Sequence, residues 1–315
     1  MDVLSDILEN LSLRSTVFAQ TELAAPWGLH AEPRPELAFH IVSSGHCWFQ
    51  VEDEPMVEVA SGDVLLLAPE RAHSLRDHPS TAPVSVRELL QAGAFGSPAT
   101  SDRASRTQII CGFFRIDDAG GEVLRSVLPR VIHTRDATTD RDPWISQTLR
   151  LLALESTGTQ PGRSTVVSRL CEALFVYVLR DHLAVSSAES GWMRGLLDPH
   201  VSRALELMHQ APDHDWTVAS LASRVGMSRS AFAAHFQELV SETPMRYLAR
   251  WRMQKAATAL RSGEIAIASI ATQAGYDSVA AFSKAFKRAV GVAPGAYRRR
   301  QIGSAAEDVA LVADE

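Results

Sequence analysis

Short apolar runs, broken by glycine, proline and acidic residues, fill most of the chain between residues 17 and 90. Ser61-Gly62-Asp63 has the composition of a turn. Regularly spaced short strands without helical periodicity favour a β-barrel or a sandwich. A further strand is expected at 111–116. The other strand-like runs lie at 37–44, 46–52, 56–61 and 63–69.

Helical patterns flank this region and follow it. In the stretch 164–183 the apolar positions recur at three- and four-residue steps, which is typical of a helix with one buried face. Pro143 stands in the first turn of an expected helix, where proline is tolerated. The expected helices cover 1–16, 142–155 and 164–183, the chain is helical with brief turns from 198 onward, and 91–108 and 184–197 are a loop and a linker.

The helical C-terminal part contains an internal repeat. ASLASRVG at 219–226 matches ASIATQAG at 268–275, and the second copy has one more residue after the glycine. The landmarks that match beyond this point are Phe232 and Phe282, Phe236 and Phe286, Val240 and Val290, Pro244 and Pro294, and Tyr247 and Tyr297. Matched landmarks across one insertion indicate a duplicated structural unit.

Each copy has the layout of a helix-turn-helix motif, at about 217–238 and 266–289. Gly226 and Gly275 stand at the turns, where a left-handed backbone is needed. Ser228 is placed to cap the second helix of the first copy, and Asp277 or Ser278 that of the second copy. The buried side of each second helix carries phenylalanines four residues apart, with Ala231 beside the first pair.

Composition sets wider limits. With 315 residues, 46% hydrophobic and 22% charged, the chain is of the size and kind expected for a globular protein of two domains. No apolar run is long enough to predict a membrane span, and the first fifteen residues do not predict a signal peptide. Cys47, Cys111 and Cys171 form no CxxC pair, which favours a reducing cytoplasm over a disulfide framework.

The net charge of −6 hides an asymmetry. Residues 198–300 hold 14 lysines and arginines against 8 aspartates and glutamates, whereas residues 1–197 are acidic overall and 301–315 hold four acids and no base. The expected helix at about 245–261 is itself rich in arginine. A basic module beside an acidic one points to a polyanion as partner of the basic half. If this helix held the two units about 35 Å apart, both could enter successive major grooves of a duplex.

The C-terminal part of the chain resembles the AraC/XylS family of transcription regulators. The resemblance rests on LASRVGMSRSAFAAHFQELVSETPMRYLARWRMQKAATAL and on IASIATQAGYDSVAAFSKAFKRAVGVAPGAYRR, and covers residues 200–300. It implies sequence-specific binding to double-stranded DNA, with base contacts from the outward faces of two recognition helices. RNA polymerase is then a further candidate partner, and a homodimer is the expected assembly.

The DNA-contacting residues that we expect combine this resemblance with the outward positions of each second helix. The expected base contacts among them are poor in arginine, asparagine and glutamine, so we expect apolar contacts to thymine methyl groups, readout of DNA shape and strong reliance on phosphate contacts. These base contacts are Ser230, Ala233, Ala234, Val279, Ala280, Ser283 and Lys284. Arg229, Arg250, Lys287, Arg288 and Arg298 are the expected phosphate contacts. The full predicted set also includes Ser228, Ser230, Ala233, Ala234, Gln237, Val279, Ala280, Ser283 and Lys284.

Residues 20–115 resemble the cupin-type sensor domain of one AraC branch. SGDVLLLAPERAH is similar to the second cupin motif, in which a histidine follows a glycine and a β-run; Gly62 and His73 keep the spacing, with the proline one residue late. The resemblance implies a pocket for a small effector of unknown identity. The predicted effector contacts are His40, Trp48, His73 and Cys111.

Two other functions stay open. His40 and His73, with His30 or His46, could form a metal site for a cupin enzyme, but Ala38 and the missing glutamate break the usual ligand pattern. Cys111 resembles a cysteine of a branch that senses reactive chlorine, but Thr21 stands where the second thiol is expected, and a buried structural cysteine is the alternative. We therefore expect no enzyme activity, no cofactor and no metal.

The sequence predicts an α+β protein with a cupin-like β-barrel, flanking helices and an all-α double helix-turn-helix domain. The expected parts are a sensor domain at 1–130, a helical region at 131–197 and a DNA-binding domain at 198–300. An acidic tail at 301–315 is expected to be disordered. The helices at 142–155 and 164–183 are expected either to mediate dimerisation or to pack onto the barrel of the same chain, and both roles are compatible. We expect a cytoplasmic protein with no membrane partner.

Overall fold

The structure is a computed structural model that describes residues 2–11, 13–52, 54–91, 106–116, 128–135, 143–185 and 192–300. The predicted tail at 301–315 and most of the predicted loop at 91–108 lie outside this part of the chain. The described residues form two compact units. One contains residues 13–116 and 128–185, and the other contains residues 2–11 and 192–300.

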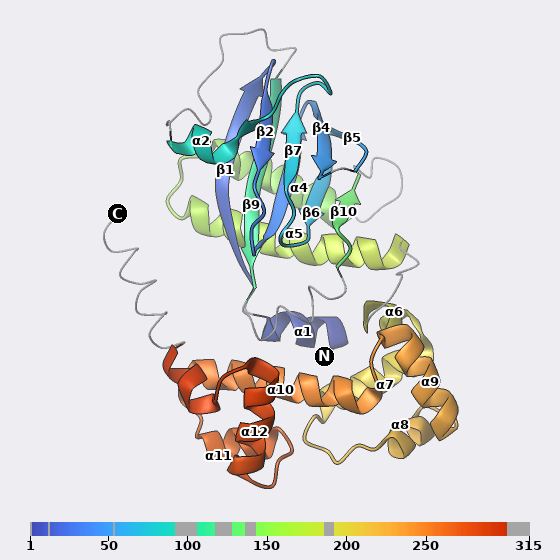
Figure 1. Cartoon of the computed structure of the whole chain (residues 1–315). Helices are drawn as coiled ribbons and strands as arrows, with labels where there is room; N and C mark the ends of the chain where they lie inside the picture. Colours follow the sequence, from blue (N-terminus) through green and yellow to red (C-terminus); the bar gives the residue numbers. More distant parts are fainter. Residues whose placement is uncertain are drawn as a thin grey trace. The chain divides into compact units, whose positions relative to one another are not determined.

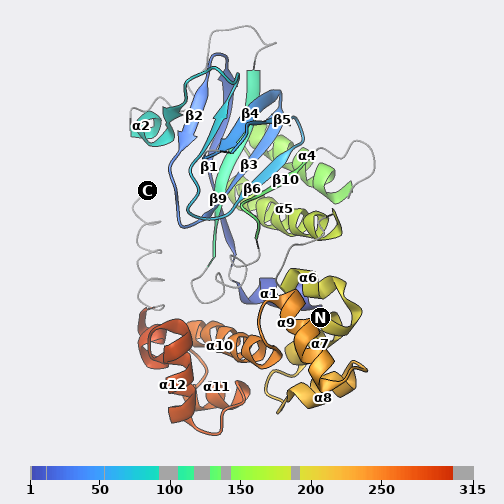
Figure 2. The ribbon, with the colours of Figure 1, turned by 45° about the vertical axis from the view of Figure 1, so that its right-hand side comes forward.

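The first unit is built on two five-stranded sheets (Figures 1 and 2). The first sheet has the order β1 (Arg14–Ala24), β9 (Arg106–Arg115), β3 (Leu37–Ser44), β6 (Val64–Leu67) and β10 (Val131–Thr134). The second has the order β5 (Val57–Ala60), β4 (His46–Val51), β7 (His73–Arg76), β2 (Gly28–Ala31) and β8 (Val84–Ser85), followed in the chain by α2 (Val86–Gln91). The predicted strands are present, and the expected cupin-like fold takes the form of two open sheets.

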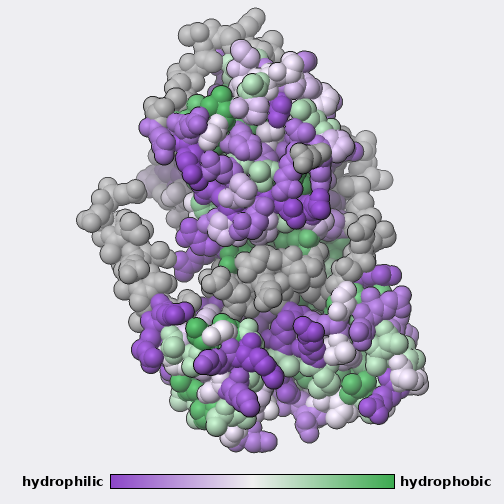
Figure 3. All heavy atoms as spheres, viewed as in Figure 1, coloured by the Kyte–Doolittle hydropathy of each residue, from purple (hydrophilic) through white to green (hydrophobic). Residues whose placement is uncertain are grey.

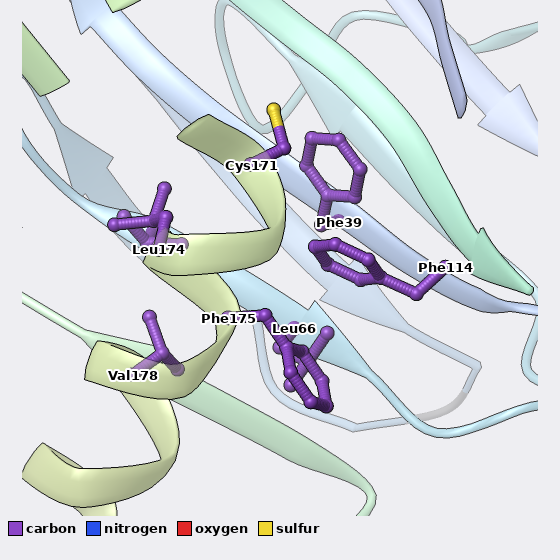
Figure 4. Close-up of a pocket in the computed structure, with 8 residues that line it drawn as sticks. Phe39, Leu66, Phe114, Cys171, Leu174, Phe175 and Val178 are labelled. Atoms are coloured by element: carbon purple, nitrogen blue, oxygen red, sulfur yellow. The ribbon is translucent and has the colours of Figure 1, made fainter. Parts of the chain in front are cut away.

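The first sheet is covered on both faces, which explains the uninterrupted apolar run of β6. Val42 and Leu65 belong to the core between the sheets, whereas Phe39, three positions before Val42 on β3, and Leu66, next to Leu65 on β6, face α5 (Arg163–Val185). Phe175 of α5 packs against Phe114 of β9 with ring centroids 4.8 Å apart (Figure 4). The predicted packing of this helix onto its own sheet is therefore observed, and α4 (Pro143–Thr157) packs beside it.

The second unit is helical, with α10 lying between two helix pairs (Figure 1). Its labelled helices are α1 (Val3–Asn10), α6 (Trp192–Leu197), α7 (Pro199–Gln210), α8 (Val218–Arg224), α9 (Arg229–Val240), α10 (Pro244–Ser262), α11 (Ile267–Gln273) and α12 (Val279–Val290), and residues 294–300 are helical as well. The basic helix expected at 245–261 is α10, and it buries Leu248, Ala256 and Leu260. No helix in the described ranges combines the length and apolarity that a membrane crossing needs.

The sequence repeat is a structural repeat. Gly226 has φ +73° and Gly275 has φ +74°, the left-handed turns that the sequence predicts. The amide after each glycine donates to the carbonyl of an alanine in the preceding helix, Ala222 or Ala271, at 2.9 Å in both copies. In each copy the phenylalanine pair is fully buried beneath the second helix, with ring centroids 5.7 Å apart in the first and 5.6 Å in the second.

The N-terminal helix α1 packs against α7 and α10. Val3, Leu4 and Ile7 are buried, and so is the acidic residue Asp6. The Asp6 carboxylate accepts a hydrogen bond from Nδ1 of His209 on α7 at 2.8 Å, and the hydroxyl of Tyr247 on α10 bonds Nε2 of the same ring at 2.7 Å. This polar chain holds three helices together, because a buried carboxylate without partners would be costly.

Three expectations differ from the structure. The first helix ends at Asn10 and the chain is already in β1 by Arg14, because the alternating run 14–24 pairs with β9. Residues 2–11 belong with the C-terminal helices, whereas the predicted sensor domain began at residue 1. The predicted linker at 184–197 contains α6, since Met193 is buried in the helical unit.

The packing of α1 predicts that it stabilises the C-terminal unit. Ile7→Ala should lower the free energy of unfolding of that unit by about 2–5 kcal/mol, the usual cost of emptying a buried aliphatic site. The measurement is hydrogen exchange of the α10 amides in the full chain. Glu9→Ala, an exposed change on the same helix, should leave exchange nearly unchanged. Equal exchange in Ile7→Ala and wild type would contradict this role.

Candidate nucleic-acid interface and ligand pocket

The second helix of each helix-turn-helix unit starts at a serine and buries one face. The hydroxyl of Ser228 accepts from the Ala231 amide at 3.3 Å, and that of Ser278 accepts from the Ala281 amide at 3.2 Å. This confirms Ser228 and selects Ser278 over Asp277 as the cap of α12. Because the phenylalanine pairs turn inward, the opposite face of each helix is directed to solvent.

The predicted DNA-contacting positions on these helices are accessible to solvent. One neighbouring position that was expected to be buried is exposed as well. Ala233 and Ser283 are half-buried. Ala231, expected inward, is exposed, because Phe232 and Phe236 alone fill the core on that side. Val279 is 43% exposed at the start of α12, which is unusual for its size. The exposed predicted positions are Ser228, Arg229, Ser230, Ala234 and Gln237 on the first unit, and Val279, Ala280, Lys284 and Lys287 on the second.

Two arginines of the predicted set are engaged within the protein. The Arg250 guanidinium forms an ion pair with Glu242 and lies 5.1 Å from the centroid of the Tyr247 ring. Arg298 donates to the backbone carbonyl of Ile265. These contacts give both side chains a structural role in joining helices. The cationic side chains that stay exposed in this unit include Arg229, Lys284, Lys287, Arg288, Arg299 and Arg300.

Polar and apolar groups alternate over the surface of this unit. Figure 3 shows purple and green side chains side by side on the lower part of the molecule, where α11 and α12 lie. A surface of this kind suits a polyanion that also presents apolar groups, because cations reach phosphates while alanine and valine can contact thymine methyl groups.

The sheet unit contains a cavity of about 380 Å³. His40 of β3 and His73 of β7, two of the predicted effector contacts, line it, with Ala38, Gly112 and Phe113 nearby and Val86 of α2 at one side. Arg34 and Arg71, which were not among the predicted contacts, also line this cavity. Arg71 stands two residues before His73, a spacing that could have placed both on one side of an extended chain.

A chain of hydrogen bonds runs along one side of the cavity. Nε2 of His40 lies 2.7 Å from Nε2 of His73, and Nδ1 of His40 lies 3.0 Å from the thiol of Cys111. Nδ1 of His73 lies 3.2 Å from the carbonyl oxygen of Arg71. Burial lowers the pKa of His73 to about 4 and holds that of His40 well below its ordinary value, so both rings are neutral near pH 7.

Neutral rings and a carbonyl acceptor determine where the protons lie. A carbonyl only accepts, so Nδ1 of His73 carries the hydrogen and its Nε2 accepts from His40. Nδ1 of His40 is then an acceptor, and the Cys111 thiol donates to it. Burial raises the pKa of this thiol, which keeps it a donor. Each ring nitrogen therefore has a partner within the protein.

Two predicted effector contacts lie elsewhere. Cys111 is directly paired with His40 across β9 and β3 and lies behind that ring instead of lining the cavity. On β4, Cys47, Phe49 and Val51 are buried whereas Trp48 is half-buried, so strand alternation turns Trp48 to the opposite face. The sequence suggested Trp48 because it belongs to a strand-like run. The strand register, which decides on which face of the sheet its side chain lies, does not follow from the sequence alone.

Of the metal-ligand candidates, His40 and His73 meet, but they meet as hydrogen-bond partners. Among the described residues no group of three or more histidine, cysteine, aspartate or glutamate side chains has the arrangement of a metal site. His40 and His73 direct their Nε2 atoms at each other at hydrogen-bonding distance, and Cys111 faces the other nitrogen of His40. Burial also raises the pKa of the Cys47 and Cys171 thiols to about 12.

Two open sheets around a cavity, joined in one chain to twin helix-turn-helix units, define the class of a DNA-binding regulator with a ligand-binding domain. Comparison with known proteins agrees with both parts. The Cupin family matches residues 2–184, and the family described as a helix-turn-helix domain matches residues 221–300.

Several relatives match almost the whole chain. AraC-like transcription regulators of Streptomyces lividans and Streptomyces antibioticus are 36% and 37% identical, each over 95% of this chain and over 98% and 99% of their own lengths. The HTH-type transcriptional regulator AlkR of Acinetobacter baylyi is 32% identical over 95% of this chain and all of its own. The chain therefore belongs to the AraC-like family of DNA-binding transcription regulators, with an N-terminal cupin domain.

The buried histidines predict a stability that depends on pH. Their folded-state pKa values are depressed, so the unfolded chain takes up protons below about pH 6.5 while the folded sheet unit does not. Stability is fully present above that pH and falls as pH decreases towards 4, by up to about 1.4 kcal/mol per histidine and pH unit. Urea unfolding at pH 7 and pH 5 measures the loss.

His73→Gln should make that loss smaller, because one buried titrating group is removed. His78→Gln, a change at an exposed histidine of the same unit, serves as the control and should keep the wild-type pH dependence. If His73→Gln loses as much stability between the two pH values as wild type does, the buried pair is not the source of the effect.

Proposed function

We propose that this regulator reads specific DNA sequences with α9 and α12 and responds to a small molecule bound in the cavity beside His40 and His73. The observation that carries the proposal is the matched construction of the two helix-turn-helix units, each with a buried phenylalanine pair and an exposed recognition face. Such faces suit the major groove. The base contacts that we propose are Ser230, Ala233, Ala234, Val279, Ala280, Ser283 and Lys284.

The phosphate contacts in this proposal are Arg229, Lys287 and Arg288, with Arg299 and Arg300 added because they are exposed. Arg250 and Arg298 are assigned instead to holding α10 and the helical residues 294–300 in place, since their guanidinium groups already have acceptors. Gln237 and Ser228 flank the proposed reading face. The exposed cations can release counterions from a duplex, which makes binding sensitive to salt.

A non-enzymatic role in the cytoplasm fits this assignment. The histidine nitrogens are committed to hydrogen bonds with each other, with Cys111 and with a carbonyl, which does not favour a cupin enzyme that needs convergent ligands and an open metal position. Buried, protonated thiols do not favour a thiolate-based redox sensor. Promoter binding would bring the protein near RNA polymerase, a further partner that we propose.

A homodimer is the assembly that we propose, through α4. Trp144, Leu151 and Leu154 are 60%, 50% and 70% exposed and fall on one side of this helix, next to the buried side that packs on α5. Exposed large apolar side chains gathered on one stripe mark an interaction surface. Both roles expected for this helical region then hold, since one face packs within the chain and another meets a second copy.

Substitution of two lysines on α12 separates the proposed base contact from the proposed phosphate contact. Lys284→Ala should weaken binding to a selected operator by about 5- to 150-fold while random duplex binding changes little, because a base contact discriminates by about 1–3 kcal/mol. Lys287→Ala should weaken binding to every duplex and reduce the slope of log affinity against log salt by about one.

Titrations of fluorescent duplexes at several salt concentrations give both quantities. Arg130→Ala, a change at an exposed arginine of the other unit, should alter neither. An equal loss on selected and random duplex in both lysine variants would remove the two assigned roles.

The dimer proposal predicts that a charge on the apolar stripe dissociates the protein. Leu151→Lys should shift the mass measured by analytical ultracentrifugation from two chains towards one at micromolar concentration. Ala153→Lys adds the same charge to an exposed position on the opposite side of α4 and should leave the mass unchanged. A mass of one chain for wild type, or of two chains for Leu151→Lys, would contradict the proposal.

A further inference from the structure

We propose that the cavity beside His40 and His73 takes a small organic carboxylate with an apolar body. This inference rests on the proposed function, in which the same cavity binds the effector, and adds the chemical class of that effector. The volume of the cavity, about 380 Å³, falls in the range of small-molecule sites and corresponds to roughly a dozen water molecules.

The histidine side of the cavity offers a ligand no strong hydrogen bond. All four ring nitrogens of His40 and His73 already bond each other, Cys111 or the Arg71 carbonyl. What remains for a ligand on this side is the carbon surface of the rings. Ala31, Ala38, Ala68, Val86 and Phe113 extend this surface with further apolar groups. A hydroxyl-rich molecule such as a sugar would lose water here and find few partners.

The charged groups of the lining lie on other residues, and they do not cancel. Glu32 forms an ion pair with Arg87, and Glu36 lies 3.7 Å from Arg115. Both acidic side chains of the lining are thereby matched by arginines. The remaining cations of the lining are Arg34 and Arg71.

Arg34 and Arg71 are only partly compensated. The Arg34 guanidinium lies 5.5 Å from the centroid of the Phe113 ring and has no ion pair with any carboxylate in the described ranges. Arg71 reaches Glu52 at 3.4 Å, a long contact, and its Nε–H is enclosed without an acceptor among the described residues. A buried donor of this kind is costly until an acceptor reaches it.

The balance of charges in the cavity lining determines which class of ligand fits. One arginine is partly neutralised by Glu52 and the other is not, so the site has room for about one negative charge. A planar carboxylate matches the guanidinium fork and can bond two N–H groups at once. With the head group at Arg34 and Arg71, the body of the ligand lies against Phe113, Val86 and the histidine rings. A monocarboxylate with a short aliphatic or aromatic body satisfies both parts.

Isothermal titration of the full chain with octanoate, benzoate and the uncharged 1-octanol tests the proposal. At least one of the two acids should bind about tenfold or more tightly than the alcohol, because a charge-assisted hydrogen bond contributes at least that factor. Arg71→Gln and Arg34→Gln should each weaken binding of that acid by about tenfold and change binding of 1-octanol by less than about twofold. Arg130→Gln is the matched control for loss of a positive charge on the same unit and should change neither.

Every other result counts against the carboxylate. Equal binding of acid and alcohol, binding unaffected by both arginine substitutions, or no binding of either acid would overturn it. Arg34 is exposed, so its variant stays informative even if the Arg71 variant fails to fold. The same samples are titrated with a selected DNA duplex. Retained salt-sensitive duplex binding with failed carboxylate binding removes this inference alone, whereas loss of both removes the proposed function.

Discussion

The burial of one phenylalanine pair under each recognition helix is the constraint on which the DNA-binding unit depends. A helix of three turns has too little surface to bury on its own, so its position comes from the side chains that it turns inward. Phe232 with Phe236, and Phe282 with Phe286, fill that role in the two copies. Once those rings are inside, the residues on the other face are held towards solvent as a rigid set. Tyr247 and Tyr297 extend each cluster, with ring centroids 6.0 Å from Phe236 and 5.6 Å from Phe286.

Between the copies, α10 is held by polar contacts as well as by its apolar face. Arg252 donates to the carbonyls of Pro212 and His214, at 2.6 and 2.9 Å, and Arg261 donates to the carbonyl of Asn10 at 3.4 Å. The Asp6–His209–Tyr247 chain adds α1 to the same unit. Residues from the start of the chain thus become part of the helical unit, while the strand that follows them belongs to the sheet unit. The chain therefore runs from α1 of the helical unit directly into β1 of the sheet unit. Strand β1 pairs with β9, a strand that lines the cavity.

The sequence could predict the fold class, the repeat and most elements, because these follow from periodicity and from residues with strong local preferences. Glycine at the two turns and serine at the N-terminus of the two second helices are residues of this kind, and they indicate where each helix ends and begins. The placement of α1 could not be predicted, since its amphipathic pattern shows that one face is buried but not against which partner. Arg250 was assigned to phosphate because its acceptor Glu242 becomes close only in the folded helix pair. In the cavity, His40 and His73 were found from motif spacing, whereas Trp48 needed the strand register and Arg34 needed the tertiary fold.

The proposed function requires that two equivalent helices of one protein chain enter the DNA together. Methylation interference on the N7 atoms of guanines in a selected duplex, with the full chain bound, probes the major groove directly. Two clusters of interfering guanines, about one helical turn apart on one face of the duplex, are the expected result for each bound chain. A single cluster per chain, or no interference at guanine N7 in a duplex that the chain binds, would show that the duplicated units do not act as a pair of groove-reading helices.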